Sequence, residues 1–384
     1  MRITPSRQPR EQGAVSIFIV IFFSLLIGVI TMSFVGIVVR GANQSTNNDL
    51  SRSAYDSAQA GVEDAKRAIA AYVNACNGGT GNCASYTGFI NNQQCGSMPG
   101  FAATLGLRTG AGNEILVQSN TDTAFDQAYT CVNTILQTPD YINKELPQHS
   151  DVIPLKSTGA FSGVTVNWFT HTDGSLADTQ PFTPRPNCSV SAVSGSSCTL
   201  PTQGNWVGNG TPALLRVQLI SYNGGTIADS ALQSNGRTLF LYPSQGGVPN
   251  GGTVSFDQDS NPPSAAAGAP LVPVHCLTTG VYSCSVNLGL GSNTGKTSFI
   301  RVTPIYKSAT FQLQLTGGAN PLFDGVQPVV DSTGRANDLF RRVEARVRME
   351  NNVLYPEYAV DVQNSFCKDY AVGADTADFI YRCP

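Results

Sequence analysis

A long uncharged apolar run near the N-terminus constrains this 384-residue chain more than any other feature. No charged side chain occurs from Ala14 to Val39, and the few polar side chains there are serine and threonine, whose hydroxyls can donate to carbonyls of their own helix. As a helix, about 26 residues extend roughly 39 Å, which exceeds the ~30 Å hydrocarbon core of a bilayer. The run therefore predicts a transmembrane helix over residues 14–39.

Arginines on the two sides of this run predict its orientation. Arg2, Arg7 and Arg10 precede it, whereas Arg40 alone follows closely. Because cytoplasmic flanks carry the excess of positive charge, we expect residues 1–13 to be a cytoplasmic leader and the rest of the chain to be extracytoplasmic. A cleaved secretory signal is the alternative, but its apolar stretch is typically only ~7–15 residues long.

The helix is expected to continue beyond the membrane, over residues 40–75. Apolar residues recur there at spacings of three and four, the helical period. They are Leu50, Ala54, Ala58, Val62, Ala65, Ile69 and Val73. Proline is absent as far as Met98, so the sequence favours one helix about 90 Å long. Two helices joined at Gly41-Ala42-Asn43 are the alternative.

Small residues on this helix indicate close packing against a neighbour. Ser24 and Gly28 lie in the apolar half, and Ala54, Ala58 and Ala65 lie in the amphipathic half. Residues of this size let another backbone approach closely. We therefore expect these five positions to be helix-packing sites.

From Cys76 onward the pattern changes to short apolar runs broken by glycine, proline, asparagine and serine. This pattern predicts antiparallel strands and an α+β fold: a long N-terminal helix, then a β-rich, disulfide-bonded head that is pilin-like or a β-sandwich. We expect a Cys-rich first lobe over 76–150 and a β-rich domain over 151–384. The expected strands are Glu114–Gln118, Tyr129–Leu136, Val164–Phe169, Leu214–Ile220, Thr238–Tyr242, Val272–Cys276, Ser298–Ile305, Thr310–Leu315, Leu339–Met349 and Val353–Val362.

The ten cysteines indicate a disulfide framework in an oxidising compartment. Short loops favour the pairs Cys188–Cys198, Cys276–Cys284 and Cys367–Cys383. The remaining four, which are Cys76, Cys83, Cys95 and Cys131, would then pair among themselves in one of three ways. Scattered free thiols are the alternative.

Two segments of the N-terminal helix resemble the start of type IV pilin-like proteins, most closely the PilX-like minor pilins. They are Gln12-Gly13-Ala14-Val15-Ser16-Ile17-Phe18-Ile19-Val20 and Ser53-Ala54-Tyr55-Asp56-Ser57-Ala58-Gln59-Ala60-Gly61-Val62-Glu63-Asp64-Ala65. The resemblance covers roughly residues 8–75. It implies a helix that first anchors in the membrane and then packs into the centre of a filament. It also implies cleavage by a prepilin peptidase between Gly13 and Ala14, although the sequence leaves open whether that cut is made.

The chain departs from the pilin pattern at Phe18. Major pilins carry a glutamate at that position, where it helps subunits align with each other. A phenylalanine there favours a minor or priming subunit, or a protein that stays in the membrane, over a bulk filament subunit. The loop between Cys367 and Cys383 is similar to the C-terminal disulfide loop of pilins.

Other motifs carry little functional signal. Gly295-Lys296-Thr297 lacks the earlier glycine of a P-loop, because Leu290 occupies that position, and a hairpin turn is expected instead. The oxygen-bearing series from Asp257 to Asn261 does not continue as a calcium-binding EF-hand. Three scattered histidines, His149, His171 and His275, do not form a zinc motif.

Taken together, these patterns predict a membrane-anchored, minor pilin-like protein that acts in filament assembly or surface contacts. The expected partners are membrane lipid, other pilin-like subunits and a host or neighbouring cell surface. The net charge of −3 gives no reason to expect nucleic acid. No catalytic residue, metal or cofactor is expected. The alternatives are a static envelope protein outside any pilus and a membrane-anchored extracytoplasmic hydrolase.

Overall fold

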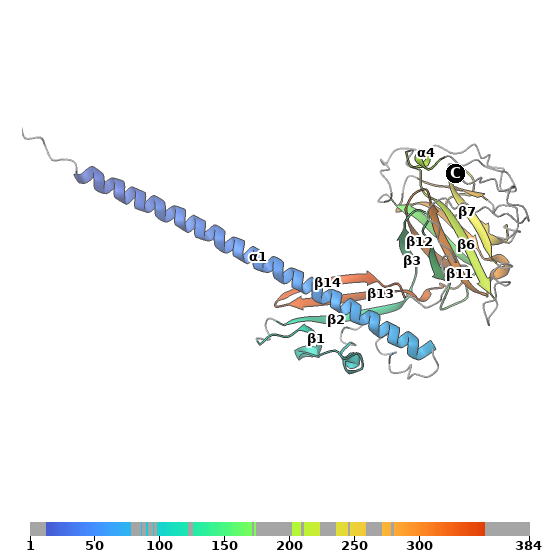
Figure 1. Cartoon of the computed structure of the whole chain (residues 1–384), viewed down its shortest axis with the longest axis horizontal. Coiled ribbons are helices and arrows are strands. Elements are labelled where there is room, and N and C mark those ends of the chain that lie inside the picture. Colours follow the sequence, from blue (N-terminus) through green and yellow to red (C-terminus); the bar gives the residue numbers. More distant parts are fainter. Residues whose placement is uncertain are drawn as a thin grey trace, which may run out of the picture. The chain divides into compact units, whose positions relative to one another are not determined.

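The structure is a computed structural model of the whole chain. It describes residues 13–77, 86, 90, 95, 98–121, 126–170, 173, 202–208, 211–222, 236–244, 246–258, 271–277 and 280–349, and for residues 13–16, 77 and 208 the backbone alone. The chain divides into two compact units (Figure 1). Unit 1 comprises Met1–Ile135 and Val329–Val347, and unit 2 comprises Leu136–Pro328 and Arg348–Pro384.

Unit 1 is built on one helix, α1 (Gly13–Asn77), of 65 residues. The expectation of a continuous helix is confirmed, since α1 runs through Gly41-Ala42-Asn43 without a joint. Its short helical segments are η1 (Met98–Phe101), α3 (Ala102–Leu105) and η2 (Ala111–Asn113). A four-stranded sheet in the order β1-β2-β13-β14 completes the unit. Its strands are β1 (Ile115–Gln118), β2 (Gln127–Thr138), β13 (Phe323–Ala336) and β14 (Leu339–Arg346). The last residues of β2 and the first residues of β13 belong to unit 2.

Strand β14, which overlaps the expected strand Leu339–Met349, has alternating burial. Val343 and Ala345 are half-buried, whereas Arg342, Glu344 and Arg346 are exposed. The strand pairs antiparallel with β13, from Val329↔Arg346 to Ala336↔Leu339. One face of this hairpin therefore meets the protein interior and the other carries charge into water.

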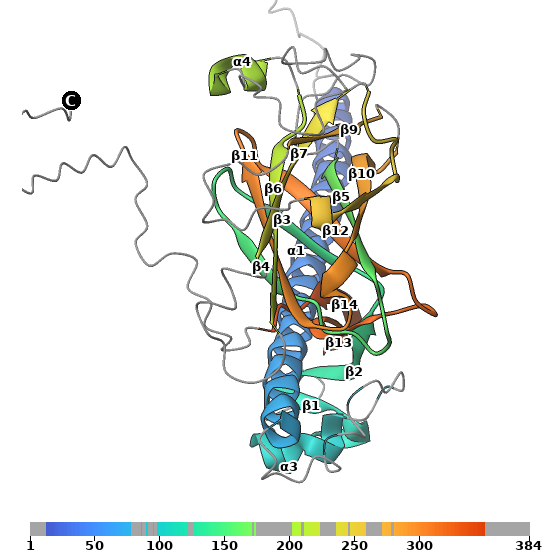
Figure 2. The same cartoon turned by 90° about the vertical axis from the view of Figure 1, so that its right-hand side faces the viewer.

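Unit 2 is a β-sandwich of two five-stranded sheets (Figure 2). The first sheet, in spatial order, is β3 (Tyr141–Glu145), β12 (Ala309–Thr316), β5 (Gly163–Thr170), β10 (Tyr282–Gly289) and β8 (Thr253–Ser255). The second is β4 (Asp151–Pro154), β11 (Thr297–Ile305), β6 (Leu214–Tyr222), β7 (Arg237–Ser244) and β9 (Leu271–His275). The short helices of this unit are α4 (Gln203–Gly208), η5 (Phe256–Gln258) and η6 (Gly291–Asn293).

Most of the sandwich pairs are antiparallel, as expected, but β8 with β10 and β7 with β9 are parallel. The two sheets enclose one apolar core, to which Trp168, Phe311, Leu219 and Val302 contribute fully buried side chains. The indole Nε1 of Trp168 donates to the carbonyl oxygen of Ala213 at 3.0 Å. That bond satisfies the polar atom of the largest side chain in the core.

The division into units differs from the boundary expected near residues 147–151. It falls between Ile135 and Leu136, and unit 1 regains Val329–Val347 later in the chain. The physical reason is strand pairing. Strands β3 and β4, on either side of the expected boundary, pair with β12 and β11 of the sandwich, whereas β13 and β14 belong to the sheet of unit 1. The expected strand Val353–Val362 lies outside the described residues.

Candidate membrane anchor and helix-packing site

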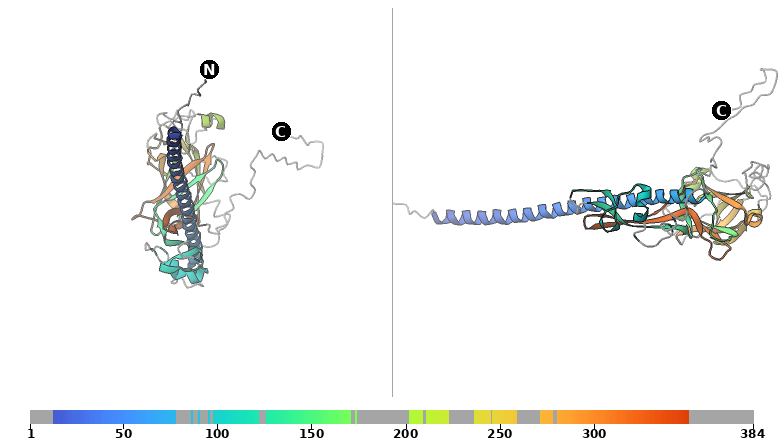
Figure 3. Two further views of the ribbon diagram at one scale, coloured as in Figure 1. Left: turned by 90° about the vertical axis from the view of Figure 1, so that its left-hand side faces the viewer. Right: turned by 90° about the horizontal axis from the view of Figure 1, so that it is seen from below.

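The first half of α1 exposes apolar side chains in every direction. The large apolar residues between Ile17 and Val39 are all exposed, from 42% at Leu26 to 80% at Met32. Mean hydropathy reaches 2.7 in its most apolar window, and none of that window is buried. Figure 3 shows this half running with no other drawn element of unit 1 beside it. The helix is thus long and apolar enough to cross a membrane.

The polar groups in this half bond to their own helix. The Ser24 hydroxyl donates to the carbonyl of Ile21 at 2.8 Å, and the Thr31 hydroxyl donates to the carbonyls of Ile27 and Gly28. Satisfied hydroxyls lower the cost of placing serine or threonine in lipid. At Gly28, no described atom lies within 4 Å of where a Cβ would stand. Ser24 and Gly28, the two expected packing positions here, are therefore open to contact from outside the described chain.

A short polar stretch separates the apolar half from the packed half. Residues 40–49 are helical and exposed, and Leu50 is the first partly buried side chain. About ten residues of helix extend roughly 15 Å. About 15 Å of exposed polar helix therefore separates the apolar half of α1 from Leu50, where its packing against the rest of unit 1 begins.

The second half of α1 packs on the sheet through small residues. Ala54, Ala58, Ala65 and Ile69 are fully buried, and Val62 is 5% exposed. These are positions of the predicted alanine-rich face, and Ala54, Ala58 and Ala65 were the expected packing residues. Ser57 and Ala68 widen the same buried face.

Two glycines that the sequence analysis did not single out complete this contact. A Cβ at Gly334 of β13 would collide with the backbones of Ala54 and Ala58. A Cβ at Gly61 of α1 would collide with the Ser332 hydroxyl and stand 3.0 Å from the ring of Tyr129. Helix and strand backbones therefore approach each other closely. A glycine inside an alternating strand is the signal that could have revealed the contact.

Polar bonds fix the position of the helix along the sheet. The Tyr129 hydroxyl of β2 donates to Asp64 of α1 at 2.9 Å. Arg67 donates to the same carboxylate at 3.0 Å and to the carbonyl of Leu105 at 2.9 Å. Burial and the neighbouring Asp64 carboxylate raise the pKa of Tyr129 well above its usual value, so this phenol stays a donor at any physiological pH.

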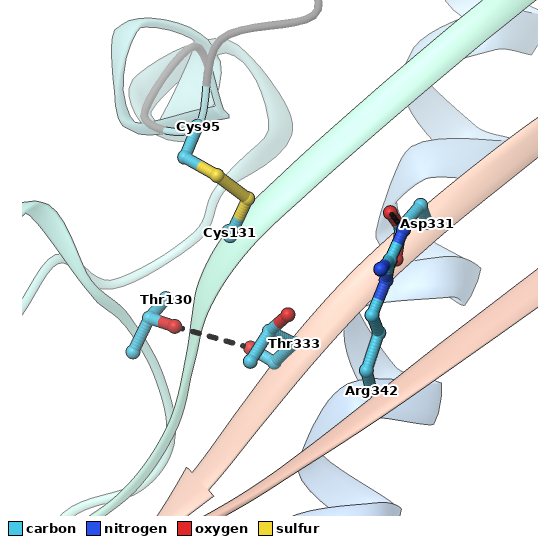
Figure 4. The surroundings of a disulfide bond; sticks show 6 residues. All are labelled: Cys95, Thr130, Cys131, Asp331, Thr333 and Arg342. Carbon is cyan, nitrogen blue, oxygen red and sulfur yellow. Dashed lines mark hydrogen bonds and ion pairs between the residues drawn. A yellow bond between two sulfur atoms is a disulfide. The ribbon is translucent and has the colours of Figure 1, made fainter.

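Basic residues of the β13–β14 hairpin make further bonds within unit 1. Arg341 donates to the Ser51 hydroxyl of α1 at 2.8 Å. Arg342 pairs with Asp331 across the hairpin (Figure 4). Arg335 forms a bidentate pair with Glu114 at 3.0 and 2.6 Å. These bonds give the arginines structural partners inside the protein.

Two disulfides lie wholly within the described residues. Cys95–Cys131 joins the segment after α1 to β2 in unit 1 (Figure 4), which is one of the pairings left open by the sequence. Cys276–Cys284, in unit 2, is the pair that the sequence favoured. Cys76 is also disulfide-bonded. Cys83, Cys188, Cys198, Cys367 and Cys383 lie outside the described residues.

The expected hairpin at Gly295-Lys296-Thr297 is wrong. The triplet connects β10 to β11, which lie in different sheets of the sandwich and do not pair. Thr297 begins β11 directly, so no helix follows the triplet, and the strand–loop–helix geometry of a P-loop is absent from this segment.

The residues considered above as calcium or zinc ligands do not form a metal site where the structure describes them. The Asp257 carboxylate accepts bonds from the amide and hydroxyl of Ser292, at 3.0 and 2.9 Å. Asp259, Asn261 and His171 lie outside the described residues. His149 is exposed and His275 half-buried. Within the part of the chain that the structure describes, no three His, Cys, Asp or Glu residues gather as a metal site.

Gly13 and Ala14, the expected cleavage junction, lie at the first turn of α1. Comparisons with protein-family models, curated proteins and solved structures gave no match to this chain.

Proposed function

We propose that this protein is a minor pilin-like subunit of a type IV pilus, anchored by α1 and acting in filament assembly or surface contacts. One observation carries the proposal. Within a single unbroken helix, the first half is apolar all round and exposed, whereas the second half is packed by small residues on an antiparallel sheet. That division matches the two roles implied by the resemblance of residues 8–75 to pilin-like proteins.

The exposed half of α1 would exchange one apolar environment for another during assembly. Before assembly, its side chains contact membrane lipid. After assembly, the same side chains contact the helices of neighbouring subunits in the filament. Because lipid tails are as apolar as leucine, close packing rather than the hydrophobic effect must favour helix association. Ser24 and Gly28 provide small positions where another helix approaches closely.

Phe18 supports an accessory role within the filament. Its ring is 75% exposed on the apolar half of α1, at the position where major pilins carry a glutamate. A phenylalanine cannot form a charge pair with a neighbouring subunit, so this subunit would lack one aligning contact. Such a subunit suits a position at low copy number, such as the start of a filament.

Phe18 also favours a second candidate, a static envelope protein that stays in the membrane. A helix without a charge in its apolar half rests in lipid at no desolvation cost. The head would then act at the membrane surface.

Mechanical shearing of cells separates the two candidates. The minor pilin predicts that the protein appears in sheared filaments and that Gly13→Leu removes it from them. Gly41→Leu is the matched control, since a side chain at Gly41 meets no described atom, and it should leave the sheared fraction unchanged. Protein that remains wholly with the membranes in the wild type would support the static anchor.

A further inference from the structure

A groove on the sandwich of unit 2 brings together residues that the proposed function does not use. It lies between the segment that follows β4 and the connection from β10 to β11, and its volume is about 510 Å³. Ligand pockets in proteins commonly measure ~300–1,000 Å³. The Gly295-Lys296-Thr297 triplet lines one side and Lys156 lines the other.

The groove is basic. Lys156 and Lys296 are two of the six lysines in the chain, and no Asp or Glu is among the lining residues. The Lys156 ammonium forms an ion pair with the Asp324 carboxylate at 3.4 Å. The Lys296 ammonium donates to the side-chain oxygen of Asn293, a neutral group, at 3.1 Å. Positive charge therefore exceeds negative charge here, although the whole chain is acidic.

Apolar and hydroxyl groups accompany the two lysines. Phe161, Ser157, Thr297 and Phe299 line the groove. Phe161 is half-buried, whereas Phe299 is only 5% exposed and forms part of the wall. A ligand held here would meet the side chain of Phe161, two hydroxyl-bearing side chains and two lysines, whose ammonium groups it would share with Asp324 and Asn293. Binding sites typically combine apolar walls with a few polar groups that fix orientation.

Backbone bonds hold the two sides of the groove in place. The amide of Leu155 donates to the carbonyl of Ser298 at 2.9 Å, and the amide of Lys296 donates to the carbonyl of Asn293 at 3.2 Å. Phe299 also stacks on Tyr222, with ring centroids 6.2 Å apart. A groove formed in advance binds its ligand at a smaller entropic cost.

We propose that this groove binds an acidic saccharide, with its carboxylate or phosphate at Lys156 and Lys296 and its sugar ring on Phe161. Sugar hydroxyls match the hydroxyls of Ser157 and Thr297, and the anionic group matches the excess positive charge. The inference concerns the head alone and does not depend on whether the protein enters a filament.

Isothermal titration calorimetry of the full-length protein in detergent tests the proposal. The probes are a glucuronic-acid oligosaccharide, glucose 6-phosphate, a neutral glucose oligosaccharide and a short polyglutamate peptide. We expect saturable binding of at least one acidic sugar and none of the neutral one. The two acidic probes distinguish a carboxylate ligand from a phosphate ligand.

Lys156→Gln and Lys296→Gln should each weaken that binding about tenfold or more, because a hydrogen bond to a charged group is lost. Lys66→Gln is the control, since this half-exposed lysine on α1 lies in unit 1 and pairs with Glu63. Circular dichroism verifies that each variant is folded. No saturable binding of either acidic sugar, equal binding by the lysine variants, or binding of polyglutamate alone would overturn the proposal.

Discussion

Gly334 of β13 lies directly against the backbone of Ala58 on α1, at a separation that leaves no room for a Cβ. The helix and the strand can therefore pack this closely only because residue 334 is a glycine and residue 58 is a small alanine. This contact fixes where the helix meets the sheet, and so fixes how much of α1 extends beyond that sheet.

Gly334→Ala should destabilise unit 1 by about 1–3 kcal/mol, because the added methyl overpacks the helix–sheet contact. Hydrogen exchange of the β13 amides should accelerate about fivefold or more. Gly100→Ala is the control, since a Cβ at Gly100 meets no described atom. Unchanged exchange in Gly334→Ala would contradict the close approach of helix and strand.

Ala58→Leu tests the same contact from the helix side. Ala58 is fully buried, so a leucine there should cost a similar ~1–3 kcal/mol. Ala70→Leu introduces the same side chain at an exposed position of α1 and should change stability little. Limited proteolysis near the end of α1 reports the difference. Equal protection of the two variants would argue against the buried alanine face.

The sequence predicted the elements with strong periodicity and missed those without it. The helical spacing from Leu50 to Val73 was sufficient for α1. Strand β13 was missed because Gly325, Pro328 and Gly334 interrupt its pattern. Yet Gly334 is the residue that allows α1 to pack on this strand. The local sequence of β13 gives only a weak strand signal. The presence of Gly334 is explained by its contact with α1, which a local pattern does not reveal.

Strand pairing accounts for the difference between the boundary expected near residues 147–151 and the division into units. The short strands β3 and β4 contain few consecutive apolar residues, so no strand was expected on either side of residues 147–151. Strand β10 reads serine, valine, asparagine and leucine from Ser285, and because half of these side chains are polar the strand was not expected. The charged groove was also hidden, because Lys156 and Lys296 come together only when the sandwich forms.

Asp173 should make the stability of unit 2 depend on pH. Burial alone would raise its pKa, but bonds from Thr170, Thr310 and Lys144 outweigh that effect and lower it. A carboxyl whose pKa is lower in the folded state contributes its full stability above its unfolded pKa of ~3.8. That stability is lost as pH falls below this value toward the lower folded pKa.

Melting temperatures of the wild type and Asp173→Asn, measured between pH 7 and pH 2, test this dependence. The wild type should be the more stable at pH 7, and the gap between the two proteins should narrow below about pH 4. A gap that stays constant over the whole range would exclude a role for Asp173 ionisation.

Loss of the Cys276–Cys284 disulfide should destabilise the sandwich by about 2–3 kcal/mol, since the closed loop is short. The two cysteines are eight residues apart. The double variant Cys276→Ser, Cys284→Ser should melt at a lower temperature than the wild type under oxidising conditions. If the two proteins melted alike without reductant, the bond would contribute nothing to stability.

N-terminal sequencing of the protein extracted from its native membrane tests the proposed pilin-like role most directly. Processing by a prepilin peptidase predicts a chain that begins at Ala14, with Gly13 and the basic leader removed. An intact leader beginning at Met1 would contradict the proposed role and leave α1 as a permanent membrane anchor.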